Sequence, residues 1–175
     1  MCEEINQWYM LTVIGKDQPG IVAHLSTLLY KQGCHLGEAS MIRLGGNFTI
    51  MLMIRCGIKD HDLIAYLAEQ SRQLELHIHC DLINGLLHHH REPDVRISVH
   101  GADRMGIVAH VTSVLATAGL DILNLESDIA GTELAPIYIM HIEGCATQGI
   151  SALRTALNEI NDMSISIESI QTVFG

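Results

Sequence analysis

The fold of this 175-residue chain is decided by the stretch Gly15-Lys16-Asp17-Gln18-Pro19-Gly20-Ile21-Val22-Ala23-His24. A close copy recurs 86 residues later as Gly101-Ala102-Asp103-Arg104-Met105-Gly106-Ile107-Val108-Ala109-His110. Each copy follows a short β-like run and leads into a helical pattern, which predicts a turn between a strand and a helix. Such a turn directs unpaired backbone N–H groups at whatever lies above the helix start, and it can hold a small anion or carboxylate. The duplication favours a small-molecule sensor.

The offset between the two copies is about half of the chain, so the repeat predicts two domains. We expect a first domain over residues 1–86, a linker over residues 87–94 and a second domain over residues 95–175. A domain of that size buries only about two-thirds of the surface that its unfolded chain exposes. The domains are therefore expected to pack on each other or on a second chain, which predicts a homo-oligomer.

The composition argues against two kinds of partner. The formal net charge is −10, because 20 Asp and Glu residues outnumber 10 scattered Lys and Arg residues. Duplex DNA binding draws most of its affinity from cations that neutralise phosphates, so we expect no direct contact with nucleic acid. The longest apolar run, residues 48–54, is far shorter than the roughly 20 residues of a membrane span, so we expect no membrane association.

The N-terminus and the cysteines favour a cytoplasmic protein. No basic segment followed by an apolar one opens the sequence, so we expect no signal peptide. The cysteines are odd in number and scattered, which favours reduced thiols over a disulfide framework. They are Cys2, Cys34, Cys56, Cys80 and Cys145.

The hydrophobic pattern of each half predicts the order strand, helix, strand, strand, helix, strand. In the first half the strands are residues 8–14, 35–44, 47–56 and 74–82, with helices that start at Ile21 and Asp60. Pro19 suits a first helical position, Gly33 a helix end, Gly45-Gly46 a hairpin and Asp60 an N-cap. In the second half the same order falls on residues 95–100, 106–118, 121–130, 136–143, 148–160 and 164–173. This α+β order is that of the ferredoxin-like unit, an antiparallel sheet with two helices on one face.

Two such units, each with Gly-x-Asp-x-Pro/Met-Gly-Ile-Val between its first strand and first helix, resemble a tandem pair of ACT domains over nearly the whole chain. The resemblance implies amino-acid-sensing modules that regulate a protein, and no attached catalytic domain fits in the chain. A stand-alone pair is similar to the glycine cleavage system transcriptional repressor family. That family acts on a separate DNA-binding activator, which agrees with the acidic charge.

The resemblance therefore implies a small amino-acid-sensing regulator, of the glycine cleavage type, that acts through a regulatory protein partner and is not an enzyme. Two alternatives stay open. The chain could be a trans-acting regulatory subunit of an amino-acid or one-carbon metabolic enzyme, because formyltetrahydrofolate deformylase and phosphoserine phosphatase carry similar regulatory ends. It could also be a structural dimerisation module, which predicts no response to any ligand.

The resemblance places the ligand, a small amino acid such as glycine or serine, at the repeated turn. Gly20 and Gly106 let a ligand approach the main chain, and the N–H groups that follow favour a carboxylate. Asp17 and Asp103 could accept a hydrogen bond from an α-ammonium group. The carried-over contact residues are Asp17, Gln18, Pro19, Gly20 and Ile21, and in the second half Asp103, Arg104, Met105, Gly106 and Ile107.

A purely structural interpretation competes at both turns, since each Asp could only cap its helix and each Gly could only turn the chain. Met105 stands where the family has proline, which leaves the second turn less constrained and predicts a looser or unused site. His24 and His110 occupy matching helix positions, where a polar role is favoured over ligand contact.

Metal binding and catalysis have little support. His77, His79 and Asp81 share one face of the predicted fourth strand and could reach a common ion, whereas His88-His89-His90 lies in the linker. No Cys-x-x-Cys or His-x-x-x-His pair supports zinc, so we expect no metal and no other cofactor. No nucleophile elbow, catalytic triad order or phosphate loop is recognisable, and we expect no catalytic residue.

Overall fold

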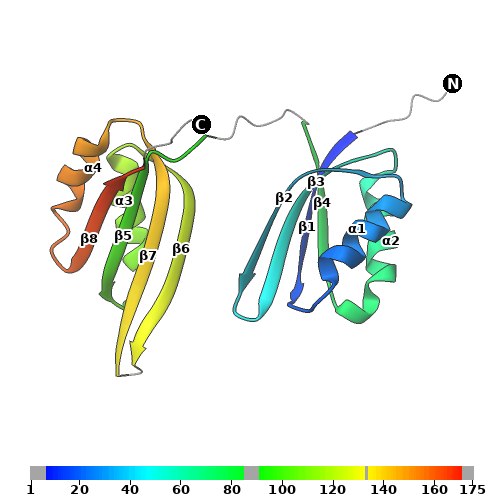
Figure 1. The fold of residues 1–175 in the computed structure, drawn as a ribbon, viewed down its shortest axis with the longest axis horizontal. Coiled ribbons are helices and arrows are strands. Elements are labelled where there is room, and N and C mark those ends of the chain that lie inside the picture. The colour runs from blue at the N-terminus through cyan, green and yellow to red at the C-terminus, as the bar shows by residue number, and fades with distance from the viewer. Residues whose placement is uncertain (1–6, 85–90, 133, 171–175) are drawn as a thin grey trace. The chain divides into compact units, whose positions relative to one another are not determined.

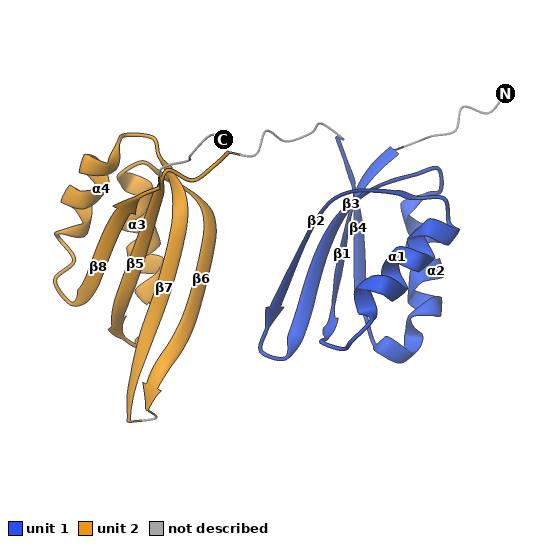
Figure 2. Ribbon diagram, viewed as in Figure 1, with its two compact units in different colours: residues 1–88 blue, residues 89–175 orange. Residues whose placement is uncertain are grey.

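The chain forms two compact units, Met1–His88 and His89–Gly175, in a computed structural model that describes residues 7–84, 91–132 and 134–170 (Figure 2). Figure 1 shows that the two helices of each unit lie on one face of its sheet. Unit 1 contains β1 (Gln7–Lys16), α1 (Ile21–Lys31), β2 (His35–Leu44), β3 (Asn47–Cys56), α2 (Asp60–Gln70), the short 3-10 helix η1 (Arg72–Leu74) and β4 (His77–Ile83). Unit 2 contains β5 (Val95–Ala102), α3 (Ile107–Thr117), β6 (Leu120–Thr132), β7 (Ala135–Ala146), α4 (Ile150–Leu157) and β8 (Met163–Ser169).

Both sheets are antiparallel and have the same topology. The strand order is β2-β3-β1-β4 in unit 1 and β6-β7-β5-β8 in unit 2. The first strand of each unit therefore lies inside its sheet, directly beneath the helices, and the strand-to-helix turn leaves from the centre of the fold. The predicted ferredoxin-like α+β fold is confirmed.

A separate hydrophobic core holds each unit together. Alternate residues of the first strand face the helices, as the period of a strand requires. Each fully buried aliphatic side chain contributes about 1.5–3 kcal/mol relative to an exposed one. The main contributors in unit 1 are Leu11, Val13, Leu25, Leu29, Leu63 and Leu67, and in unit 2 Ile97, Val99, Val111, Leu115, Met140 and Leu153.

Glycine positions set the limits of the first helix and of the first hairpin. Gln32 is the C-cap of α1, and Gly33 follows with a φ of 68°. The Gly33 N–H donates to the Tyr30 carbonyl at 2.9 Å and the Cys34 N–H to the Leu29 carbonyl at 3.0 Å. This is a Schellman motif, so the helix end predicted at Gly33 is confirmed. The predicted hairpin is also confirmed, because Gly45 and Gly46 have φ of 57° and 76° between β2 and β3.

Three predicted details of unit 1 are wrong. Pro19 is not the first helical residue, because Gly20 intervenes as an N-cap in the left-handed conformation, with φ of 90°. Asp60 is the first residue of α2, and Lys59 is its N-cap. The Asp60 carboxylate therefore stabilises the helix by its charge near the positive end of the helix dipole, and it does not occupy the capping position. The fourth strand begins at His77 instead of residue 74, because η1 and the left-handed Glu75, with φ of 48°, turn the chain first.

In unit 2 the element limits differ from the prediction mainly at the hairpin and at the last helix. Strands β6 and β7 are longer than predicted, because their ladder continues to the pair Thr132 and Ala135. Helix α4 is shorter, with Gly149 as its N-cap and Asn158 as its C-cap. Among the described residues, no helix is long and apolar enough to cross a membrane.

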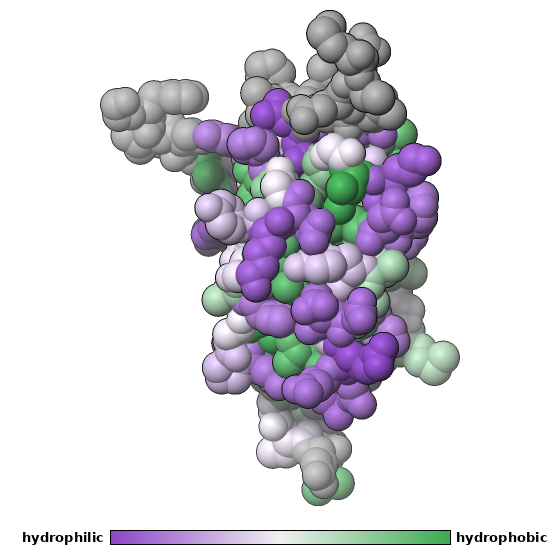
Figure 3. Space-filling model, turned by 90° about the vertical axis from the view of Figure 1, so that its right-hand side faces the viewer, coloured by the Kyte–Doolittle hydropathy of each residue, from purple (hydrophilic) through white to green (hydrophobic). Residues whose placement is uncertain are grey.

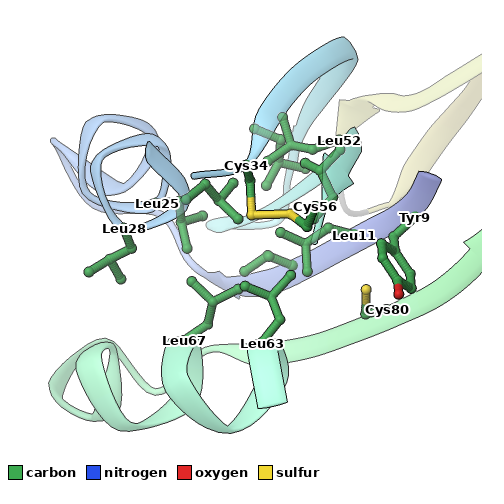
Figure 4. Close-up of a cluster of buried hydrophobic side chains, with 14 of the residues drawn as sticks. Tyr9, Leu11, Leu25, Leu28, Cys34, Leu52, Cys56, Leu63, Leu67 and Cys80 are labelled. Atoms are coloured by element: carbon green, nitrogen blue, oxygen red, sulfur yellow. A yellow bond between two sulfur atoms is a disulfide. The ribbon is translucent and has the colours of Figure 1, made fainter. Parts of the chain in front are cut away.

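The expectation of five reduced thiols is wrong, because Cys34 and Cys56 form a disulfide (Figure 4). The pair His35 and Arg55 is in register between β2 and β3, so the two cysteines one residue further out lie opposite each other. Their Cα atoms are 4.5 Å apart. Scattered positions in the sequence concealed this pairing, since only the hairpin register brings the two side chains together.

Cys80 is a free cysteine, and burial raises its pKa from 9.0 to about 11, with Asp60 and Asp81 adding to the effect. Its thiol packs in the core from β4, opposite Leu11 of β1. A pKa of about 11 instead of 9.0 lowers the thiolate fraction at pH 8 about 100-fold. We therefore expect iodoacetamide to modify Cys145 of the native protein long before Cys80, as measured by peptide-resolved mass spectrometry.

The same raised pKa predicts a pH dependence of stability. The folded state favours the neutral thiol, so this contribution is fully present below pH 9 and is lost as the pH rises toward 11. The free energy of unfolding of the parent should fall more steeply over that range than that of Cys80→Ala. Equal slopes, or rapid alkylation of Cys80 at pH 8, would contradict this.

Candidate functional site

The repeated turn of unit 1 is fixed by the β2–β3 hairpin on one side. The Asp17 N–H donates to the Gly46 carbonyl at 3.0 Å, and the Asp17 carboxylate forms an ion pair with Arg43 at 3.3 Å. Asp17 is therefore held at the hairpin. The pair is largely exposed, so it contributes little to stability.

A groove opens on the helix side of this turn. It has a volume of about 700 Å³, within the usual range of small-ligand sites. One wall is the turn and the first residues of α1, and the other is the end of α2 with η1. The lining residues are Pro19, Gly20, Ile21, His24, Glu69, Gln70, Arg72, Gln73 and Leu74.

Gly20 gives the groove an open edge. Its φ of 90° is a conformation that side-chain-bearing residues rarely adopt, and a Cβ atom built there would meet no atom within 4 Å. The backbone is thus accessible to a ligand at the point where α1 begins. The first N–H groups of α1, starting with that of Ile21, have no acceptor within the helix, and the positive end of the helix dipole lies there.

The lining of the groove carries charges of both signs. Arg72 and the start of α1 offer positive charge, whereas Glu69 and the carbonyl end of α2 offer negative charge. A groove with both signs suits a small molecule that carries a carboxylate and an ammonium group. The helical side of unit 1, which Figure 3 turns toward the viewer, is largely hydrophilic with small apolar areas, and this also suits a polar ligand.

A partly buried polar contact joins the two walls of the groove. The Ser71 hydroxyl, on a residue only 2% exposed, lies 3.3 Å from Nε2 of His24. This contact ties the end of α2 to the first turn of α1. His24 lines the groove, so the contact fixes the orientation of a lining side chain.

A second hollow, of about 490 Å³, lies on the strand side of the same turn. It involves Gly15 and Lys16 of β1, Asn47 of β3, and Glu75 and His77 around the start of β4. A Cβ atom at Gly15 would come within 2.6 Å of Leu76, so only glycine fits there without a shift. Asp17 and Gln18 line neither hollow.

The turn of unit 2 has the same backbone but different surroundings. Gly106 is the N-cap of α3 with φ of 84°, and the His110 N–H donates to its carbonyl at 2.9 Å, as the His24 N–H does to that of Gly20. The Arg104 guanidinium forms an ion pair with Asp162, and the Ile107 N–H donates to the Arg104 carbonyl at 3.4 Å. The second turn therefore engages groups within its own unit that a ligand would need.

The remaining residues of the second turn are placed similarly. The Asp103 N–H donates to the Pro136 carbonyl at 3.3 Å, the counterpart of the contact between Asp17 and the first hairpin. Met105 is fully exposed. All ten predicted contact residues thus lie at two equivalent turns, and sequence reasoning missed the opposite wall of the groove in unit 1, in particular Glu69, Ser71 and Arg72.

The metal candidates do not form a ligand cluster. Within the described residues, no three His, Cys, Asp or Glu side chains come close enough to hold an ion. His79 and Asp81 form a pair at 3.0 Å, with both side chains exposed. The segment His88-His89-His90 lies outside the described residues.

Comparisons with known proteins agree with the two-unit architecture. One ACT domain model matches residues 8–81 and another matches residues 95–155. Two UPF0237 proteins, from two strains of Listeria monocytogenes, are each 39% identical to the chain over 75 residues. That segment is 40% of this chain and 82% of each relative.

Two solved structures resemble nearly the whole chain. An unknown protein from Galdieria sulphuraria is 24% identical, with a TM-score of 0.68 over 95% of this chain and 99% of that chain. A proposed glycine cleavage system transcriptional repressor is 19% identical, with a TM-score of 0.67 over 96% of this chain and 99% of that chain. At these identities the likeness shows a shared fold.

Proposed function

Because the chain belongs to the ACT domain family, with one such domain in each unit, we propose that this regulatory protein senses a small amino acid and acts through a protein partner. The observation that carries the proposal is the groove beside the turn at Gly20, with its accessible backbone and its two signs of charge. We propose glycine or serine as the ligand, because the main chain at Gly20 is accessible at the edge of the groove.

In the proposed complex the carboxylate of the ligand faces the start of α1 and Arg72, and the ammonium group faces Glu69 and the end of α2. Pro19, Gly20 and Ile21 provide the contacts of the turn. Asp17 and Gln18 border the site from the hairpin side, where Asp17 would have to leave Arg43 to reach an ammonium group. The equivalent residues of unit 2, from Asp103 to Ile107, form a weaker site.

The partner is proposed to be a separate regulatory protein. A net charge of −10 opposes direct binding to DNA, and the similar structure that is named a proposed glycine cleavage system transcriptional repressor suggests control of transcription. We place the protein in the cytoplasm and assign it no catalytic step. A homo-oligomer would cover β2, an edge strand whose ten residues are all exposed.

Calorimetry with glycine and with serine tests the ligand. Even the best small ligands gain only about 1.5 kcal/mol per heavy atom, so glycine cannot bind tighter than a few micromolar, and we expect hundreds of micromolar. Arg72→Ala should weaken binding at least about tenfold, because it removes a charge-assisted hydrogen bond. Arg104→Ala, at the turn of unit 2, is the matched control and should change binding little. Absence of both binding heat and thermal stabilisation with every amino acid would reject the sensor.

Co-purification from native cells tests the partner separately. Recovery of a DNA-binding regulator supports the transcriptional role, whereas recovery of an amino-acid or one-carbon metabolic enzyme would favour regulation of that enzyme. A mobility shift of duplex DNA by the isolated protein at physiological salt would contradict the proposed indirect action.

A further inference from the structure

The disulfide of unit 1 joins the segment that follows α1 to the strand end that precedes α2, and these are the two helices that carry the groove. Cys34 directly follows the Schellman motif that ends α1, and Cys56 is the last residue of β3, just before the short segment that leads into α2. The groove lies at the other ends of these helices, between the start of α1 and the end of α2. The bond therefore closes one end of the helix pair, and the groove occupies the opposite end.

The bond is also part of the core. Cys56 is fully buried and Cys34 is 8% exposed. Figure 4 shows the two sulfur atoms among leucine side chains that come from α1, β3 and α2, including Leu25, Leu52 and Leu63. Loss of the bond would therefore affect the packing between both helices and the sheet.

Unit 2 shows that the fold does not need this bond. In unit 1 the cysteines lie next to the pair of His35 and Arg55. The equivalent pair in unit 2 is Asp121 and Cys145. The residues next to it, Leu120 and Ala146, therefore take the place of the two cysteines. Leu120 is buried at 6% exposure. An apolar pair therefore fills this position in the same architecture, and the cross-link belongs to the groove-bearing unit alone.

We propose that Cys34 and Cys56 form a reversible thiol–disulfide exchange site that makes the stability of unit 1, and not that of unit 2, depend on the redox state. The inference goes beyond the proposed function and holds whether or not the groove binds an amino acid. In a reducing compartment the pair is a dithiol, and a low-molecular-weight disulfide converts it to the cross-linked form.

One molecule of a dithiol reductant is enough to reduce the Cys34–Cys56 disulfide to two thiols. A thiolate of the reductant attacks the Cys34 sulfur, the more accessible of the two, and Cys56 leaves as a thiolate that takes up a proton. The second thiol of the reductant then attacks the mixed disulfide and releases Cys34 as a thiol. The reductant ends as a cyclic disulfide. Because both cysteines are buried, we expect the reaction to proceed through local opening of unit 1.

The cross-link is expected to have a large effect on unit 1. It joins residues 22 apart in the sequence, and closing a loop of this length changes the equilibrium constant of unfolding by roughly 100- to 300-fold. Where the reduced unit is partly unfolded, its apparent affinity for a ligand falls in proportion to the folded fraction. The redox state would then set how much of the protein can sense its ligand.

A single tryptophan makes the test specific for unit 1. Trp8 lies in β1, where the Arg55 guanidinium stacks 5.5 Å from its ring centroid, and it is the only tryptophan in the chain. Urea unfolding is followed by Trp8 fluorescence, with and without dithiothreitol, after pre-treatment with oxidised glutathione. We expect dithiothreitol to lower the urea midpoint of the Trp8 transition. Far-ultraviolet circular dichroism also reports the unfolding of unit 2. The urea midpoint of that transition should not change with dithiothreitol.

The control variant Cys34→Leu/Cys56→Ala copies the pair of unit 2 and should be insensitive to dithiothreitol. Alkylation of the oxidised protein in denaturant without reductant should modify Cys80 and Cys145 but leave Cys34 and Cys56 blocked. The proposal is overturned if Cys34 and Cys56 are alkylated without reductant, if dithiothreitol leaves the Trp8 transition unchanged, or if it shifts the unit 2 transition equally. It is also overturned if the control variant keeps the sensitivity of the parent.

Discussion

Gly20→Val is expected to abolish amino-acid binding at the turn of unit 1 while unit 2 remains unchanged. A Cβ atom at position 20 meets no protein atom within 4 Å, and Gly20 lines the groove, so we expect a valine side chain there to occupy space that the ligand needs. It stands beside the Ile21 N–H, where the proposed site receives the carboxylate. We expect a loss of at least 3 kcal/mol, roughly 100-fold or more, which takes a weak ligand beyond detection by calorimetry.

Two companion variants separate a blocked site from a damaged fold. Valine at φ of 90° is strained by roughly 1–3 kcal/mol, whereas asparagine tolerates the left-handed conformation better. Gly20→Asn should therefore keep the Trp8 unfolding transition close to that of the parent and still lose binding. Gly106→Val, at the equivalent position of unit 2 with φ of 84° and equally open space, should leave glycine binding at the turn of unit 1 intact. Binding by Gly20→Asn with the parent's affinity would remove the turn from the site.

Gly144→Ala is expected to unfold unit 2 and to leave unit 1 folded. Gly144 lies in β7 between Val95 of β5 and Ile122 of β6. The irregularity after Ile122 brings β6 so close that an added Cβ atom would lie 2.3 Å from the Asp121 carbonyl oxygen. The backbone of a central strand cannot yield as a flexible side chain does, so we expect a cost above the usual 1–3 kcal/mol of overpacking. A domain of about 85 residues has a free energy of unfolding of only roughly 4–13 kcal/mol, so a cost of this size removes much or all of it.

As in the redox test, Trp8 fluorescence reports on unit 1, and the remaining change in far-ultraviolet circular dichroism reports on unit 2. The Trp8 transition should match that of the parent, whereas the far-ultraviolet circular dichroism of the native protein should lose the part that comes from unit 2. Gly101→Ala is the matched control, because the nearest atoms to its Cβ atom belong to side chains, Met163 at 3.2 Å and Ile107 at 3.5 Å, and not to backbone. If Gly144→Ala shifts the Trp8 transition as well, the units fold as one, and their independence is rejected.

The fold could be predicted because local signals mark most of its boundaries. Strands β2 and β3 have the predicted limits, since Gly33 ends the helix before them and Gly45-Gly46 forces the hairpin. The junction from α2 to β4 was mispredicted, because η1 and the left-handed Glu75 interrupt the extended chain there, after the buried Ser71. The alternation of apolar residues from residue 74 could not reveal that the chain turns there before it extends.

The candidate site was predicted only in part, because its two walls come from distant parts of the sequence. The turn with Gly20 carries a local motif, whereas Arg72 has no neighbours in the sequence that mark it as a binding residue. Asp17 was expected to face a ligand, but the hairpin brings Arg43 within 3.3 Å of its carboxylate. The Cys34–Cys56 bond escaped prediction for the same reason, since it depends on strand register.

The unequal turns of the two units determine the shape of the response that such a sensor can give. Arg104 is engaged by Asp162 within unit 2, so a ligand there has to compete with an existing ion pair. In the proposed sensor, two unequal sites without coupling would fill one after the other as the metabolite accumulates, and the sum of their saturation curves would rise more gradually than either alone. Such a sensor would respond gradually over a wide range of ligand concentrations and would not switch abruptly at one threshold.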